Sequence, residues 1–141
     1  MKHAKWISAL MLLFVPLIAA AQLGQSGRIV TQVPFKFMVA DVAIPAGEVT
    51  VQLANENARV LIVSNRDAKV STFARPLPAE SRNTVQVGAM VFHKYGNSYF
   101  LAGLKIADSR IVYQFRQSKL EKELVAQNLR PTEEILLAST R

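Results

Sequence analysis

His93 is the only histidine beyond the first 21 residues, and histidine is the side chain best suited to general acid–base chemistry near neutral pH. A histidine base needs a carboxylate that orients its ring, or a nucleophile within hydrogen-bond reach. Its sequence neighbours Phe92, Lys94 and Tyr95 supply neither. We therefore expect His93 to pack on Tyr95 or Tyr99 at the end of a strand, and an enzyme that uses His93 is the less favoured hypothesis.

Tyr95 and Tyr99 flank a predicted hairpin turn, and a tyrosine ring with its polar tip is well suited to contact a partner. Together with His93 they form the candidate interaction patch. The alternative is that both rings cap the rim of the core. Trp6 falls in the N-terminal segment, so no tryptophan remains for the stacking platform that carbohydrate-binding sites usually have.

Other kinds of catalytic or metal site find no support in the sequence. The chain has no cysteine, which excludes thiolate zinc sites and thiol catalysis. It contains no calcium-binding loop, P-loop, G-x-S-x-G motif or G-x-G-x-x-G motif. No two of its acidic residues stand out as an acid–base couple: Asp41, Glu48, Glu56, Asp67, Glu80, Asp108, Glu121, Glu123, Glu133 and Glu134. We expect a non-enzyme with no catalytic residue, no cofactor and no metal.

The N-terminal segment 1–21 has the three parts of a cleavable secretory signal peptide. These are the basic residues Lys2 and Lys5, the apolar run 7–18, and the small residues Ala19 and Ala21 at a cleavage site. An uncleaved membrane anchor is the alternative, but residues 7–21 are only 15 residues, fewer than the roughly 20 that a helix needs to cross a bilayer. We expect cleavage after Ala21, export to the periplasm or out of the cell, and no transmembrane segment in the mature chain.

Cleavage leaves 120 of the 141 residues, which is the size of one ordinary domain. Residues 22–27 are small and polar and are predicted to be a flexible leader. A single β domain should occupy residues 28–130. Residues 131–141 are expected to be either a last strand or a C-terminal tail. Because cysteine is absent, a packed core must stabilise the domain.

The basic residues are scattered along the chain. The formal net charge is +7, and the loss of Lys2 and Lys5 lowers it to +5. Nucleic-acid-binding proteins concentrate lysine and arginine on one face or along one helix. We therefore interpret the positive charge as an aid to solubility and expect no nucleic-acid partner.

Alternating apolar and polar residues predict several short strands, at 33–39, 48–54, 58–64, 69–74 and 110–115. Segments 84–93 and 98–106 flank Gly96 and Asn97, and they form the most clearly predicted hairpin. Segment 75–83 contains two prolines and few apolar residues, so it is predicted to be a loop, one that could cross from one sheet to another.

Two further expectations concern side-chain direction. Strict alternation along 98–106 would place Phe100 and Leu104 on the same face. Near the C-terminus, Ser118 and Glu121 have the spacing of a capping box ahead of strong helix formers, which predicts one helix near 118–127. Leu120 and Leu124 lie one turn apart in it and are expected to dock the helix on a sheet.

These elements predict a mostly β protein: an antiparallel β-sandwich or small barrel of about seven strands with one C-terminal helix. A parallel α/β sheet would need helices between the strands, and the sequence predicts none there.

Two segments resemble a family of small exported bacterial β proteins of unknown function. The first carries V-P-F from Val33 and P-A-G-E from Pro45, and the second runs from Val91 through V-F-H-K-Y-G to Y-F-L-A at Ala102. The helix region is similar at Ser118, Glu121, Glu123 and Leu124. The chain departs from the family at Val49, where an aromatic residue is common. The resemblance spans 33–127 and implies export and a β fold, but no activity.

The leading functional hypothesis is an exported β domain with a non-catalytic binding role, or a structural role in the envelope or outside the cell. The alternative is a carrier of a small apolar ligand, because segments 60–63 and 89–92 are apolar on both faces and would suit the wall of a cavity. The partner, a protein or a small apolar molecule, stays open.

Overall fold

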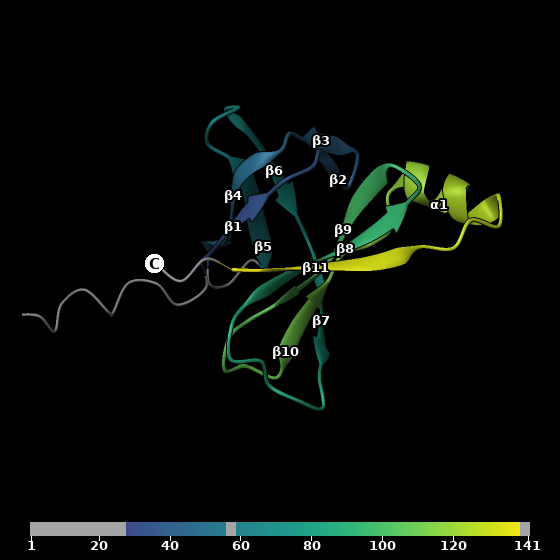
Figure 1. Ribbon diagram of the computed structural model, residues 1–141. Coiled ribbons are helices and arrows are strands. Elements are labelled where there is room, and N and C mark those ends of the chain that lie inside the picture. Colours follow the sequence, from purple (N-terminus) through teal and green to yellow (C-terminus); the bar gives the residue numbers. More distant parts are fainter. Residues whose placement is uncertain (1–27, 56–58, 139–141) are drawn as a thin grey trace, which may run out of the picture.

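The computed structural model describes residues 28–55 and 59–138. The predicted signal peptide, with its cleavage residues Ala19 and Ala21, and the predicted leader 22–27 lie outside the described residues. Eleven strands and one helix follow one another in this part of the chain (Figure 1): β1 (Arg28–Val33), β2 (Phe37–Val39), β3 (Val42–Ile44), β4 (Gly47–Asn55), β5 (Val60–Asn65), β6 (Val70–Ala74), β7 (Leu77–Glu80), β8 (Ala89–Tyr95), β9 (Ser98–Lys105), β10 (Ile111–Gln114), α1 (Lys119–Ala126) and β11 (Thr132–Leu137).

The strands form two sheets. The first has the order β1-β4-β5-β6, and the second has the order β11-β8-β9-β10-β7, with β2 paired to β9 and β3 paired to β2. Neither sheet closes into a barrel, so the structure confirms the mostly β fold and the sandwich with one C-terminal helix. The barrel alternative is wrong, and the strands number eleven rather than about seven among the residues described.

The chain changes sheet where prolines interrupt the ladders. Pro34 lies between β1 in the first sheet and β2 in the second, and Pro76 lies between β6 and β7 in the same way. Proline cannot donate a hydrogen bond to a neighbouring strand, so it favours the corners at which a strand leaves its sheet. The predicted strand 33–39 is therefore divided at this corner.

The predicted loop 75–83 contains a strand, so that prediction is wrong. β7 pairs antiparallel with β10, with Pro78 opposite Tyr113. It is the edge strand of the second sheet and three of its four residues are exposed. An edge strand can hold a proline and can lack an apolar face, which is why the pattern was missed. The predicted crossing between sheets does occur here.

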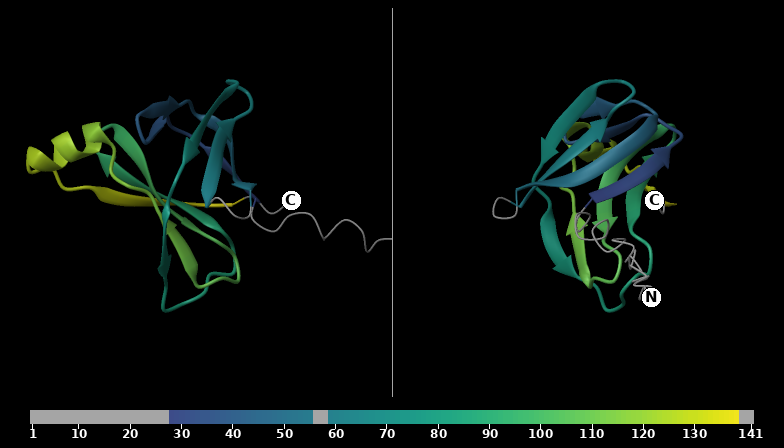
Figure 2. Two further views of the ribbon diagram at one scale, coloured as in Figure 1. Left: turned by 180° about the vertical axis from the view of Figure 1, so that it is seen from behind. Right: turned by 90° about the vertical axis from the view of Figure 1, so that its left-hand side faces the viewer.

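The core lies between the two sheets. Its largest fully buried side chains are Phe37, Phe92, Ile44, Leu61, Met90 and Leu104. Phe92 contacts Phe37 edge to face, with 5.0 Å between ring centroids. At the β7–β10 edge the second sheet turns away from the first, as Figures 1 and 2 show. The two sheets therefore diverge toward this edge.

The predicted hairpin is confirmed as β8 and β9, and its turn consists of Gly96 and Asn97. Tyr95 pairs with Ser98, Gly96 has a φ of 60°, and Asn97 is not among the residues with positive φ. These features fit a type II′ turn, in which glycine takes the first central position. A β-bulge then shifts the register between Val91 and Phe92.

Because of this bulge, the prediction that Phe100 and Leu104 share a face of β9 is wrong. Phe92 pairs with Leu101 but Val91 pairs with Gly103, so β9 carries one extra residue at Ala102. An extra residue reverses the side-chain alternation beyond it. Leu101 and Leu104 therefore both belong to the core between the sheets, whereas Phe100 points to the outer face, where it contacts Tyr95.

The C-terminal part of the domain consists of the helix and the last strand of the second sheet. The predicted helix near 118–127 is confirmed as α1, which lies beyond the tip of the β8–β9 hairpin (Figure 1). Of the two alternatives for the C-terminal segment, the structure has the strand: β11 pairs with β8 from Thr132 to Leu137. No helix in the described ranges is long and apolar enough to span a membrane.

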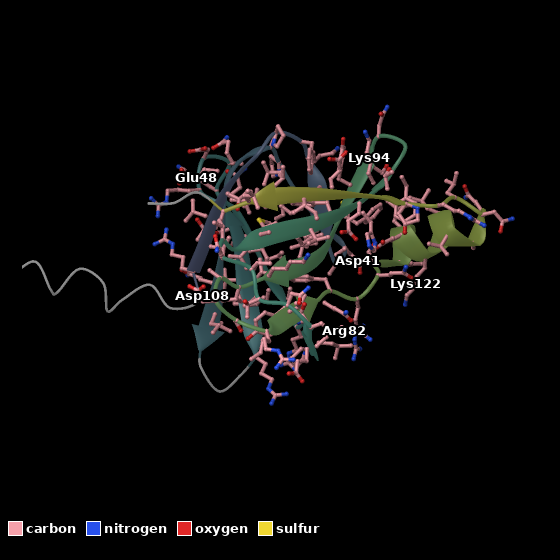
Figure 3. All side chains as sticks on the ribbon, turned by 60° about the horizontal axis from the view of Figure 1, so that its bottom comes forward. Asp41, Glu48, Arg82, Lys94, Asp108 and Lys122 are labelled. Carbon is pink, nitrogen blue, oxygen red and sulfur yellow. The ribbon has the colours of Figure 1, made fainter. Side chains whose placement is uncertain are left out.

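The charged side chains labelled in Figure 3 occur at both ends of the molecule. Glu48 and Asp108 lie at one end, whereas Lys94 and Lys122 lie toward the end that carries α1 (Figure 3). Arg82 lies apart from both groups.

Candidate functional site

A buried carboxylate joins the helix to the hairpin. Glu121, on the first turn of α1, is only 3% exposed. Its Oε1 atom lies 3.0 Å from Nδ1 of His93 and accepts a hydrogen bond of 3.1 Å from the hydroxyl of Tyr95. Since residues two apart on a strand share a face, His93 and Tyr95 both point to the outer face of β8. The helix meets that face at Glu121.

The local sequence explains why Glu121 is available for these contacts. Ser118 is the N-cap of α1, and its hydroxyl accepts a 3.1 Å hydrogen bond from the backbone N–H of Glu121. In a full capping box the glutamate side chain would turn back to the backbone N–H of Ser118. Here its carboxylate binds His93 and Tyr95 instead. Ser118 is therefore confirmed as the predicted N-cap. The carboxylate of Glu121, in contrast, contacts residues that are far away in the sequence.

The 3.0 Å contact favours one tautomer of His93. A carboxylate in its ionised form only accepts hydrogen bonds, so its contact with Nδ1 favours a proton on that nitrogen and leaves Nε2 for other partners. The His93 side chain is 33% exposed, which leaves this second nitrogen within reach of solvent. Burial, and secondarily the charge of Glu121 and its hydrogen bond, raise the pKa of Tyr95 to about 12.

The helix does not dock as the sequence predicts. Leu120 is 45% exposed, so the expectation that Leu120 and Leu124 together form the docking face is wrong for Leu120. Glu121 takes the buried position, and Leu124 is half-buried. A carboxylate that meets two hydrogen-bond partners can be buried at acceptable cost, and this geometry orients the helix toward the hairpin.

The candidate patch of His93, Tyr95 and Tyr99 does not form one exposed surface. Tyr95 is buried, and Tyr99 lies on the other face of the hairpin, opposite Lys94 in the register. There the Tyr99 ring stacks on Phe35 with 3.7 Å between centroids, and the Lys94 ammonium lies 5.4 Å from the Tyr99 ring. The structure therefore brings His93 and Tyr95 together and separates Tyr99 from them.

A shallow pocket of about 330 Å³ lies beside His93 on the outer face of the second sheet. Its polar and charged lining residues are His93, Lys105, Gln114 and Glu133. Glu133 is the register partner of His93 on β11. No serine or threonine lines the pocket, so His93 has only water to activate as a nucleophile there.

A second pocket, of about 240 Å³, opens between the sheets where they diverge. It is lined by Leu53, Leu61, Leu104, Ile106, Ser109, Ile111 and Tyr113. Leu53 and Leu61 come from the first sheet, and the other residues come from the second sheet and its β9–β10 connection. Apart from Ser109 and Tyr113, the lining side chains are aliphatic. We call this the inter-sheet pocket.

The described residues include no candidate metal centre, and the inter-sheet pocket is partly open to solvent. Within residues 28–55 and 59–138, no group of three or more histidine, aspartate or glutamate side chains is placed to hold a metal ion. Ile111 lines the pocket and is 48% exposed, so part of its apolar wall faces solvent.

Sequence reasoning missed both the carboxylate partner of His93 and the inter-sheet pocket. Glu121 lies 28 residues from His93 in the sequence. Its place in a capping box already explained why a glutamate occurs at this position. The pocket depends on how far two sheets diverge, for which the residue pattern carries no signal. The apolar residues at 60–63 were the nearest hint, because Leu61 is one of the lining residues.

The chain was compared with known protein families, curated proteins and solved structures. No protein-family model, no curated protein and no solved structure matches the chain.

Proposed function

We propose that this protein is an exported, non-catalytic binding domain that carries a small apolar ligand between its two sheets. The observation that carries the proposal is the inter-sheet pocket, whose wall is almost entirely aliphatic. Binding sites for small molecules are concave and mostly apolar, with a few polar groups that orient the ligand. Ser109 and Tyr113 supply such groups here.

The size of the pocket limits the ligand. A dry cavity of about 150 Å³ lined by aliphatic and aromatic side chains binds benzene. The inter-sheet pocket, at about 240 Å³, is larger than that but smaller than a drug-sized site. It suits a molecule of one or two rings or a short acyl chain.

Native mass spectrometry tests the proposal on protein purified from the cells that make it. We expect a one-to-one adduct of a small apolar molecule that organic extraction removes. The substitution Ser109→Phe, which fills part of the pocket, should abolish the adduct. The bare mass of the polypeptide, found in every preparation, would contradict the proposal.

Export is part of the same proposal, and the N-terminal segment 1–21 supports it. The protein would then act in the periplasm or outside the cell. Fractionation of the producing cells, followed by mass measurement of the processed chain, checks both points. We expect Gln22 as the first residue, and a full-length chain retained in the cytoplasm would refute export.

Water-activating hydrolysis by His93 is a second candidate function. The Glu121 carboxylate at Nδ1 supplies the orienting partner that a histidine base requires, and His93 lines the shallow pocket. This candidate predicts that the protein hydrolyses an activated ester such as 4-nitrophenyl acetate faster than free imidazole does. The variant His93→Ala should lose the excess rate while keeping its fold by circular dichroism. A rate equal to that of imidazole would dismiss the candidate.

A further inference from the structure

Three arginines line a third pocket, of about 430 Å³, on the side of the molecule where β6 passes into β7. Its lining residues are Arg59, Arg75, Pro76, Leu77, Pro78 and Arg116. Arg59 directly precedes β5, Arg75 lies between β6 and β7, and Arg116 follows β10. The fold thus brings together three cations that are far apart in the sequence. We call this the arginine pocket.

The described lining of the pocket carries positive charge without an acidic residue. The ion pairs His93–Glu121 and Arg110–Glu80 do not include an arginine of the pocket. No aspartate or glutamate lines the pocket. Arginine cannot relieve the repulsion by releasing a proton, because its guanidinium stays charged at any ordinary pH. An anion bound from solution would relieve it.

Two prolines restrain the backbone on one side of the pocket. Pro76 and Pro78 fix their own φ angles and form part of the wall. Restrained walls lower the entropy that a pocket loses when it binds a ligand.

We propose that the arginine pocket binds an oxyanion of the phosphate or sulfate class. The planar guanidinium donates two parallel N–H groups, a geometry that matches the oxygens of phosphate. Three guanidiniums around one pocket can therefore coordinate several oxygens of a tetrahedral anion. All three arginine side chains are exposed, so the anion can exchange with solvent, and added salt should weaken its binding.

The arginine pocket and the inter-sheet pocket are neighbours. Tyr113 lines the inter-sheet pocket, Pro78 lines the arginine pocket, and these two residues are paired in the β7–β10 register. The anion can therefore be a free phosphate, or it can be the headgroup of a molecule whose apolar part enters the inter-sheet pocket. The chemistry at the arginines is the same in both cases.

Isothermal titration calorimetry with sodium phosphate at low ionic strength tests the oxyanion site. We expect one saturable site in the wild-type protein. The double variant Arg59→Gln/Arg116→Gln should bind phosphate at least about tenfold more weakly, because each charge-assisted hydrogen bond contributes substantially. Circular dichroism checks that the variant is folded.

A matched double variant controls for net charge. Arg66 lies in the β5–β6 turn and Arg82 lies beyond the far end of β7, and neither lines the pocket. Arg66→Gln/Arg82→Gln removes the same two charges and should bind phosphate within about twofold of wild type, as expected for charges screened over distance. The absence of a saturable phosphate site in wild type, or an equal loss in both double variants, would overturn the proposal.

Octyl phosphate distinguishes the two sources of the anion. Tighter binding of octyl phosphate than of inorganic phosphate, with that advantage lost in Ser109→Phe, identifies a headgroup. Equal affinities identify a free anion. Both results uphold the oxyanion site, and the inorganic phosphate arm does not depend on the inter-sheet pocket.

Discussion

The Nδ1 atom of His93 lies 3.0 Å from the Oε1 atom of Glu121, which connects the end of strand β8 to the first turn of helix α1. Tyr95 donates to the same oxygen at 3.1 Å. One buried carboxylate thus meets two donors from the hairpin. This polar cluster holds the helix at the hairpin.

Replacement of Glu121 should destabilise the protein strongly. Glu121→Ala leaves the Tyr95 hydroxyl and the His93 ring without their shared acceptor, and we expect a loss of about 2–4 kcal/mol in the free energy of unfolding. Glu121→Gln retains one acceptor oxygen and should lose less. Urea unfolding measures both variants. Glu123→Ala, on an exposed position of the same helix, is the control and should change stability by no more than about 0.5 kcal/mol.

Tyr95 should make stability sensitive to alkaline pH. Its pKa is raised from 10.0 to about 12 in the folded protein. The unfolded chain releases the phenol proton in this window while the folded protein keeps it. The stability from this group is therefore complete below pH 10 and is lost as the pH rises toward 12.

Alkaline titration of tyrosine absorbance follows this ionisation directly. The wild-type protein should show one tyrosine with a midpoint near pH 12, and Tyr95→Phe should lack that transition. The same variant should also lose the corresponding fall in stability between pH 10 and pH 12. A wild-type titration with every tyrosine at an ordinary pKa would be inconsistent with the buried cluster.

Thr31→Val should stabilise the protein. Thr31 is 1% exposed on β1, and its hydroxyl has no hydrogen-bond partner in the described structure. Valine keeps the shape of the side chain and removes the unsatisfied group, so we expect a gain of about 1 kcal/mol in urea unfolding. Thr84→Val, at an exposed position, should leave stability nearly unchanged. A loss of stability in Thr31→Val would mean that the hydroxyl has a partner.

The sequence predicted those strands in which every second residue is buried in the core. Val49 and Val51 of β4 are buried as the pattern predicts, and the two-residue turn at Gly96 follows from local preference. β7 was not predictable, because an exposed edge strand is stabilised by its pairing with β10 rather than by an apolar face of its own. The direction of Phe100 was not predictable either, since a bulge at Ala102 changes the alternation.

The candidate site was predictable only in part. His93 and Tyr95 share a face because they lie two residues apart on one strand, and the cap at Ser118 follows from a local motif. The contact between Glu121 and His93 depends on where the helix packs, and the convergence of Arg59, Arg75 and Arg116 depends on the crossing between the sheets. Such long-range placement leaves no periodic trace in a single sequence.

Titration with naphthalene, followed by its fluorescence, tests the central proposal most directly, because this neutral molecule of two fused rings fits the inter-sheet pocket by size. Ser71→Phe adds the same apolar ring on the exposed side of β6 and serves as the matched control. We predict saturable one-to-one binding by wild type and by Ser71→Phe. Binding by Ser109→Phe should be at least about tenfold weaker, a cost of about 1.4 kcal/mol. Unsaturable binding by wild type, or equal affinity in Ser109→Phe, would contradict a ligand site between the sheets.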